Sequence, residues 1–109
     1  MKILIAGGSG FIGSHLGLFL QSKGHRVELL TRQNNFLFNT YDKIIYWDQL
    51  DKISSKDFHM IINLCGYDIA QKKWSAKIKT KIITSRIEST QKIIKFIGKS
   101  DTWLLNASA

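Results

Sequence analysis

The chain has 109 residues, 44% of them apolar, which fits one globular domain and excludes disordered and fibrous classes of protein. A single cysteine, Cys65, excludes an internal disulfide framework and a multi-cysteine metal cluster, which suits a reducing compartment. The net charge of +8 raises the question of nucleic-acid binding, but the whole excess falls within residues 72–99, where nine basic residues accompany one acid.

The hydrophobic pattern predicts strands that alternate with helices. Residues 2–6 form a short apolar run that ends in glycine, as in a strand buried on both faces. Phe11, Ile12, Leu16, Phe19 and Leu20 then recur at helical spacing, and Gly24 marks the end of that helix. The first apolar run is too short for a signal peptide or a membrane span, so we expect a cytoplasmic protein without a membrane partner.

Further along the chain, strands are predicted at residues 26–31, 43–47, 59–64 and 103–106. A short helix is expected within residues 50–57 and a long one over residues 75–97. The face of the long helix toward the core is predicted to carry Ile83, Ile87, Thr90, Ile94 and Ile97. Alternating strands and helices call for parallel pairing through right-handed crossovers. The fold class is therefore α/β, a Rossmann-type parallel sheet of about five strands with flanking helices.

The stretch GGSGFIG lies between the first predicted strand and the first predicted helix. Gly8, Gly10 and Gly13 match G-x-G-x-x-G, whereas Gly7, Gly10 and Gly13 match G-x-x-G-x-x-G. In either register the glycines permit a tight turn, close approach of the backbone to a pyrophosphate, and close packing of helix on strand. The N–H groups of residues 10–12 then face the anion from a helix N-terminus. The stretch predicts a dinucleotide cradle, and a P-loop is excluded because no Lys-Ser or Lys-Thr follows at the required offset.

The end of the second strand indicates which dinucleotide is bound. An acid at this position would bind the ribose 2′-hydroxyl of NAD, but here the strand ends in Thr31 and Arg32, and Glu28 lies in mid-strand. The Arg32 guanidinium is suited to a 2′-phosphate and the Thr31 hydroxyl to a hydrogen bond, which favours NADP over NAD. The alternative is that Arg32 is an ordinary solvated cation at a strand end.

Several segments together resemble a known family. ILIAGGSGFIGSHL, LLTR, INLCG, DIAQKKW, SRIESTQKII and LLNASA are similar to segments of the extended short-chain dehydrogenase/reductases, specifically the NAD(P)-dependent epimerase/dehydratase family. Within that family they resemble the subgroup of nucleoside-diphosphate-sugar epimerase-like proteins. The resemblance covers residues 1–109 and implies an NAD(P)-binding Rossmann domain. Intact relatives transfer hydride through the nicotinamide, as oxidoreductases or epimerases, on sugar-nucleotide-like or other hydroxyl or carbonyl substrates.

The resemblance also implies roles for individual residues. Contacts to the cofactor pyrophosphate are implied for Gly7, Gly10, Phe11, Ile12 and Gly13. Thr31 and Arg32 correspond to the adenosine ribose contacts, Asp48 to the acid near the adenine, and Leu64, Cys65 and Gly66 to the segment beside the cofactor. Ser108 corresponds to the catalytic serine at the end of the fifth strand. Arg86 is a departure, because many extended members have asparagine there.

A larger departure concerns the catalytic Tyr-x-x-x-Lys pair, in which the tyrosine is the general acid/base and the lysine lowers its pKa. Tyr41, Tyr46 and Tyr67 are followed four positions later by isoleucine, leucine and glutamine, so no pair is present. The family's C-terminal substrate-binding region is not found either. We therefore expect a truncated Rossmann domain that binds NADP(H) and is inactive alone.

Other functions stay open at this point. One alternative is a stand-alone NADP-sensing regulatory module, and a less favoured one is a basic RNA-associated protein. The lysines of residues 72–99 are distributed around a predicted helix, so we interpret them as its solvated face and do not expect a nucleic-acid partner. His15, His25 and His59 lack metal-ligand spacing, so no metal site is expected. An exposed sheet edge predicts a homodimer or other self-association.

Overall fold

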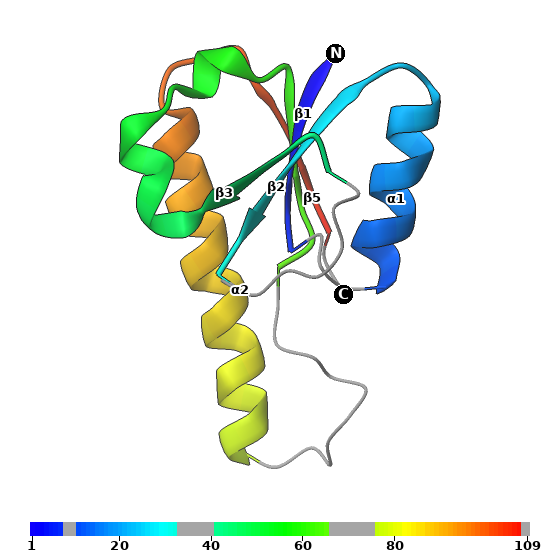
Figure 1. The fold of residues 1–109 in the computed structure, drawn as a ribbon. Coiled ribbons are helices and arrows are strands. Elements are labelled where there is room, and N and C mark those ends of the chain that lie inside the picture. The colour runs from blue at the N-terminus through cyan, green and yellow to red at the C-terminus, as the bar shows by residue number, and fades with distance from the viewer. Residues whose placement is uncertain (8–10, 33–40, 66–75, 108–109) are drawn as a thin grey trace.

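The computed structural model describes residues 1–7, 11–32, 41–65 and 76–107. Its strands form one parallel sheet in the order β3-β2-β1-β4-β5, with helices on both faces (Figure 1). The strands are β1 (Lys2–Ala6), β2 (Arg26–Thr31), β3 (Lys43–Tyr46), β4 (Met60–Asn63) and β5 (Trp103–Asn106). The helices are α1 (Phe11–Ser22), α2 (Ala76–Ile97) and two 3₁₀ helices, η1 (Trp47–Lys52) and η2 (Ser55–Asp57). The predicted α/β Rossmann-type sheet is confirmed.

The chain starts at the centre of the sheet and builds outward in both directions. Strand β1 pairs with β2 on one side and with β4 on the other, so the strand order reverses at β1. In open parallel sheets, ligands bind outside the carboxyl ends of the strands at such a reversal. The amino end of α1 and the amino-terminal half of α2 both lie at this end of the sheet (Figure 1).

Alternation of side chains along the strands produces a hydrophobic core on each face of the sheet. On the α1 side, Leu16 and Leu20 pack against the buried residues Ile3, Ile5, Val27, Leu29, Tyr41 and Ile62. On the α2 side, Trp47, Leu50 and Phe96 pack against a second buried set, which comprises Leu4, Ala6, Leu30, Ile45, Phe58, Ile61 and Ile93. The two cores hold α1 and α2 on opposite faces of the sheet.

The predicted buried face of α2 is wrong for three of its five residues. Ile83, Ile87 and Ile94 are each at least half exposed, and only Thr90 and Ile97 are partly buried. The side of α2 that packs on the sheet carries the buried residues Ser89 and Ile93 instead. The spacing of isoleucines is misleading because isoleucine also occupies the solvent side, whereas a polar serine occupies the packed side. In α1, likewise, Ile12 and Phe19 are exposed.

The helix expected within residues 50–57 is instead two 3₁₀ helices, which begin earlier, at Trp47. Side chains divide the segment into separate turns. The Gln49 side chain accepts a hydrogen bond of 2.9 Å from the Tyr46 N–H, and the Ser54 hydroxyl accepts one of 3.2 Å from the Lys56 N–H. Such local bonds offer the backbone an alternative to a continuous α-helix. Trp47 therefore leaves the sheet, and β3 ends at Tyr46.

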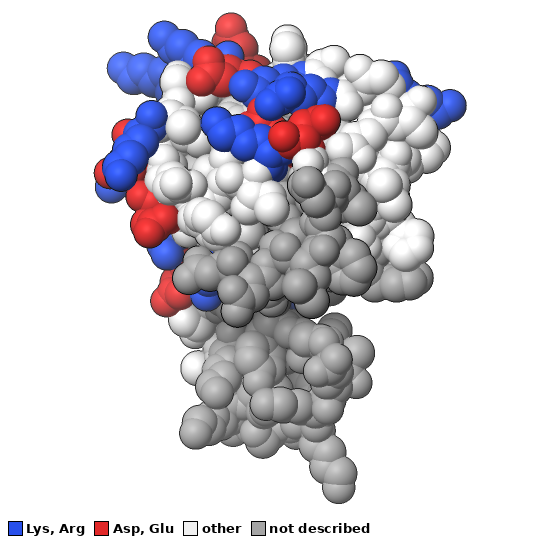
Figure 2. Space-filling model, in the orientation of Figure 1, with Lys and Arg blue, Asp and Glu red and all other residues white. Residues whose placement is uncertain are grey.

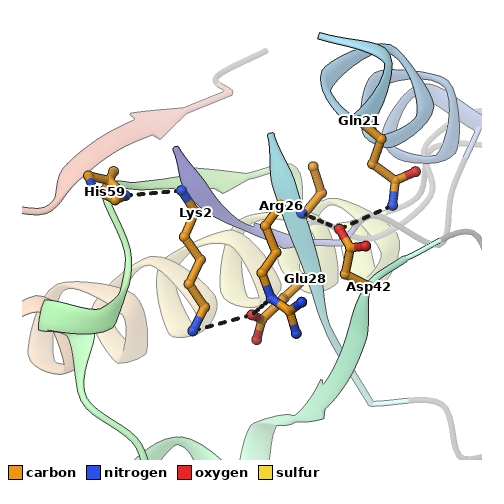
Figure 3. A network of polar contacts seen from close by, with 7 residues as sticks. Lys2, Gln21, Arg26, Glu28, Asp42 and His59 are labelled. Atoms are coloured by element: carbon orange, nitrogen blue, oxygen red, sulfur yellow. Dashed lines mark hydrogen bonds and ion pairs between the residues drawn. The ribbon is translucent and has the colours of Figure 1, made fainter. Parts of the chain in front are cut away.

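Glu28 is buried and forms ion pairs at the amino-terminal half of the sheet. Its Oε2 lies 3.4 Å from the Lys2 Nζ and accepts a hydrogen bond of 3.0 Å from the Arg26 Nε (Figure 3). Nearby, the Asp42 carboxylate accepts bonds from the Val27 N–H, at 2.7 Å, and from the Gln21 side chain of α1. Glu28 thus forms ion pairs with Lys2 and Arg26. As its mid-strand position predicted, its carboxylate is not at the carboxyl end of β2.

Strand β5 pairs with β4 along its whole length, from Met60 with Trp103 to Asn63 with Asn106. It lies at an edge of the sheet, and Trp103 and Leu105 are exposed by 74% and 57%. The expected self-association rests on this edge and stays a prediction.

Within the parts of the chain that the structure describes, no helix combines the length and apolar character needed to cross a bilayer.

Candidate functional site

The turn after β1 is held against the end of β4. Gly7 has a φ of +77°, a conformation that L side chains rarely adopt, and its N–H donates a hydrogen bond of 3.4 Å to the Leu30 carbonyl. A Cβ on Gly7 would lie 2.7 Å from the Cys65 backbone nitrogen and 2.8 Å from the Leu64 carbonyl carbon. Glycine is therefore required here by both conformation and space. The predicted site residues Gly7, Leu64 and Cys65 are brought together.

The amino end of α1 follows this turn. The helix begins at Phe11, so the N–H groups of its first turn, including those of Phe11 and Ile12, have no partner within the helix. No acidic residue occupies that turn. The macrodipole therefore leaves a partial positive charge at the carboxyl end of the sheet. The predicted residue Gly10 lies outside the described residues, and Gly13 is buried in the helix.

Tyr41 fixes α1 in place, and sequence reasoning missed it. Its hydroxyl donates a hydrogen bond of 3.0 Å to the Gly13 carbonyl. A Cβ on Gly17 would lie 2.8 Å from the Tyr41 ring. Burial raises the pKa of Tyr41 to about 12, so the hydroxyl stays a donor at neutral pH. The Gly13 and Gly17 spacing in the helix was the available signal, because two glycines one turn apart admit a large side chain.

A surface cavity of about 480 Å³ lies at the carboxyl ends of β2 and β3. Its lining residues are Thr31, Arg32, Tyr46, Trp47, Asp48, Gln49 and Lys52. The predicted residues Thr31, Arg32 and Asp48 thus surround one space, with Thr31 buried and the other two exposed. Thr31 and Tyr46 are register partners, so the cavity is lined by the ends of two adjacent strands. Sequence reasoning missed Tyr46, Trp47, Gln49 and Lys52, although Trp47 and Gln49 directly adjoin Asp48.

Asn63, at the end of β4, connects several elements around Cys65. Its side-chain nitrogen donates to Asn106 of β5, at 2.7 Å, and to Thr90 of α2, at 3.3 Å, and its oxygen accepts from the Cys65 N–H at 3.1 Å. Burial raises the pKa of the Cys65 thiol to about 11, although the charge of Arg32 acts in the opposite direction. Cys65 is thus partly buried and protonated at neutral pH, as expected for a residue without a nucleophilic role. Gly66 lies outside the described residues.

The last predicted site residue, Ser108, also lies outside the described residues. Backbone pairing with β4 continues to Ala107, whose N–H donates a hydrogen bond of 3.0 Å to the Asn63 carbonyl.

On α2, the Arg86 Nε is buried and has no hydrogen-bond partner among the described residues. Arg86 lies one turn before Ser89 and Thr90, on the side of α2 that packs on the sheet.

No group of three or more His, Cys, Asp or Glu residues with metal-binding geometry occurs in the described parts of the chain. Two of the histidines have other partners: the His25 Nδ1 lies 3.1 Å from the Met1 amino group, and the His59 Nδ1 accepts from the Lys2 N–H at 3.0 Å (Figure 3). Basic and acidic side chains are interleaved on the described part of the face in Figure 2, and Lys and Arg do not form a continuous basic field there.

Comparison with known proteins identifies relatives of the chain among epimerase family proteins. The chain is 32% identical over 111 residues to epimerase family protein SDR39U1 of Bos taurus, covering 96% of this chain and 36% of that one. It is 35% identical over 113 residues to epimerase family protein SSP1921 of Staphylococcus saprophyticus, covering 97% of this chain and 37% of the relative. The chain thus spans about a third of the length of these relatives.

Solved structures have the same fold. The crystal structure of human epimerase family protein SDR39U1 with NADPH superposes with a TM-score of 0.78 at 31% identity, covering 96% of this chain and 36% of that one. UDP-glucose 4-epimerase from Brucella ovis in complex with NAD gives a TM-score of 0.78 at 16% identity, which shows the fold alone. The model of the NAD dependent epimerase/dehydratase family matches residues 3–109, and the chain belongs to that family.

Proposed function

We propose that this chain binds NADP(H) and is the nucleotide-binding part of an enzyme of the epimerase/dehydratase family. The observation that carries the proposal is the cavity at the ends of β2 and β3, where Thr31, Arg32 and Asp48 meet. The carboxyl ends of β2 and β3, which line this cavity, lie at the same end of the sheet as the amino end of α1 (Figure 1). A dinucleotide that crosses this edge would reach both features at once.

The pyrophosphate would lie at the amino end of α1. There the N–H groups of Phe11 and Ile12, in the first turn of the helix, are suited to bind phosphate oxygens. The fit is supported by the backbone around Gly7, which approaches Leu64 and Cys65 too closely for any side chain. The end of β4 would therefore flank the cofactor without obstructing it.

The adenosine would lie in the cavity that these residues line, where Asp48 would accept a hydrogen bond from the adenine amino group and Thr31 with Arg32 would contact the ribose. NADP is favoured over NAD because the strand-end cation suits a 2′-phosphate. The carboxylate of Glu28 is buried between Lys2 and Arg26 and so does not compete for that position. The related human protein was crystallised with NADPH, which supports the same choice.

In an enzyme of this family, the bound nicotinamide nucleotide accepts or donates a hydride. Ser108, which follows β5, would orient the hydroxyl or carbonyl of the substrate. The general acid/base is not contributed by these residues, because none of the three tyrosines is followed by lysine at the fourth position. We therefore expect the 109-residue chain to bind NADP(H) without transferring hydride.

Isothermal titration of the chain with NADPH and with NADH tests the proposal. The expected result is saturable binding of both nucleotides, tighter for NADPH, with no oxidation of NADPH when candidate carbonyl substrates are added. Arg32→Met lowers the preference for NADPH, whereas Lys99→Met, at the opposite end of the sheet, leaves it unchanged. Absence of heat with either nucleotide, from a chain shown to be folded by circular dichroism, would refute the proposal.

A further inference from the structure

The cavity at the ends of β2 and β3 is lined by two cations. Arg32 follows the last residue of β2, and Lys52 is the last residue of η1. Among the lining residues that belong to the described parts of the chain, only Asp48 carries a negative charge, so the cations are in excess there. Both cationic side chains belong to exposed residues and are free to approach a ligand from solvent.

The geometry of η1 explains why a residue six positions beyond β3 returns to the cavity. A 3₁₀ helix has three residues per turn, so residues three apart lie on one face. Tyr46, Gln49 and Lys52 have this spacing, and all three line the cavity. The Gln49 side chain bonds to the Tyr46 N–H at 2.9 Å, which fixes the first turn. The three-residue repeat therefore places Lys52 on the same face as Tyr46 and Gln49, and this face lines the cavity.

Tyr46 in turn is the register partner of Thr31, the residue before Arg32. The start of η1 and the Arg32 backbone thus leave neighbouring strands at the same level. The two cations reach the cavity from different directions, one from the strand end and one from the end of η1. A group with several anionic oxygens is the ligand chemistry that two such cations suit.

Resting on the proposed binding of NADP(H), we propose that Lys52 joins Arg32 in holding the 2′-phosphate, so that Lys52 is a specificity-determining residue for NADP(H) over NAD(H). Arginine offers a planar pair of donors to two phosphate oxygens, and lysine adds a compact point charge to a third. NADH carries an uncharged hydroxyl at the 2′ position. Lys52 therefore adds affinity for one nucleotide and little for the other.

Lys92 provides a matched control. It belongs to α2 and lines a separate small cavity together with Arg32, Trp47, Glu88 and Ser89. Its Nζ lies 5.8 Å from the centroid of the Trp47 ring. Lys92 is therefore a lysine near Arg32 that does not line the larger cavity, and it reports any effect of general positive charge.

The experiment compares Lys52→Met, Lys52→Arg and Lys92→Met with the unchanged chain, titrated with NADPH, NADH and adenosine 2′,5′-bisphosphate. Lys52→Met is expected to weaken NADPH and the bisphosphate by about tenfold, the size of a hydrogen bond to a charged group, and to leave NADH within about twofold. Lys52→Arg restores most of the affinity. Lys92→Met leaves all three ligands unchanged, and the loss in Lys52→Met shrinks as salt is raised.

Three results would overturn the inference: Lys52→Met weakens NADPH and NADH by the same factor, changes neither, or matches Lys92→Met in its effect. Because Lys52 is exposed, thermal unfolding of Lys52→Met should follow the unchanged chain, which excludes misfolding as the cause. Failure of the underlying function is distinguishable, because the unchanged chain would then bind neither dinucleotide.

Discussion

The Tyr41 hydroxyl donates a hydrogen bond of 3.0 Å to the Gly13 carbonyl, which ties the segment before β3 to the first turns of α1. The Tyr41 ring also occupies the space next to Gly17. Since α1 presents its amino end to the proposed pyrophosphate, this contact sets the position of the helix that would bind the cofactor.

Tyr41→Phe keeps the ring and removes the hydrogen bond. We expect the free energy of unfolding to fall by about 1 kcal/mol, the usual net value of such a bond, and NADPH affinity to fall with it. Urea denaturation measures the first effect and titration the second. Tyr46→Phe is the control for stability alone, because Tyr46 is only partly buried but lines the proposed cofactor cavity. Equal stabilities of Tyr41→Phe and the unchanged chain would show that the bond contributes nothing.

Gly7→Ala tests the close approach of the β1 turn to β4. The new Cβ would suffer both the positive φ and a contact of 2.7 Å with backbone, so we expect a loss of about 2–4 kcal/mol in the free energy of unfolding. Gly24→Ala separates the two causes, because Gly24 has a φ of +88° but no atom within 4 Å of the added Cβ. Its expected loss is about 1–2 kcal/mol. A Gly24→Ala loss as large as that of Gly7→Ala would mean that crowding at Cys65 is unimportant.

Ile93→Ala and Ile94→Ala test which side of α2 packs on the sheet. Ile93 is 1% exposed, so its truncation should cost about 2–4 kcal/mol through lost burial and a cavity. Ile94 is 55% exposed, and its truncation should change stability by less than about 0.5 kcal/mol. The two variants, compared in one denaturation series, are controls for each other. A larger loss of stability in Ile94→Ala than in Ile93→Ala would instead support the buried face that the isoleucine spacing predicts.

The reactivity of Cys65 should depend on pH in a defined way. Because burial raises the pKa of this thiol to about 11, the thiolate is scarce at pH 8, and the rate of reaction with a disulfide reagent should increase up to about pH 11. In the unfolded chain the thiol ionises at lower pH, so this group's contribution to stability is complete below about pH 9 and declines as the pH rises toward 11. Arg32→Met removes a charge that lowers the pKa of Cys65 and should slow the reaction further. A rate plateau near pH 9 would contradict the effect of burial.

Much of the sheet could be predicted from the sequence, because each strand is a short apolar run and the glycine turn marks where β1 gives way to α1. Parallel strands place their carboxyl ends at one end of the sheet, so the strand pattern predicts a binding site beside Thr31 and Arg32. Asp48 was assigned to that site by the resemblance to the family. The packed side of α2 could not be found, since hydrophobic periodicity does not detect a side that carries Ser89.

Two residues of the site region escape prediction for a different reason. Tyr41 ends a polar loop in the sequence, and only the tertiary structure shows its ring packed against the α1 glycines. Lys52 comes to the cavity through a 3₁₀ repeat, whereas the sequence predicts a helix that starts later in the segment. In both cases the placement depends on contacts between elements, which local spacing does not encode.

Arg32 and Lys52, to which we assign the choice of coenzyme, are exposed and lie beyond the ends of the packed strands. Gly7 is constrained by neighbouring backbone whatever ligand is present, whereas the two rim cations support no core. The proposed roles of these two cations therefore predict that substitutions at the rim exchange one coenzyme for the other, without compensating changes elsewhere in the sheet.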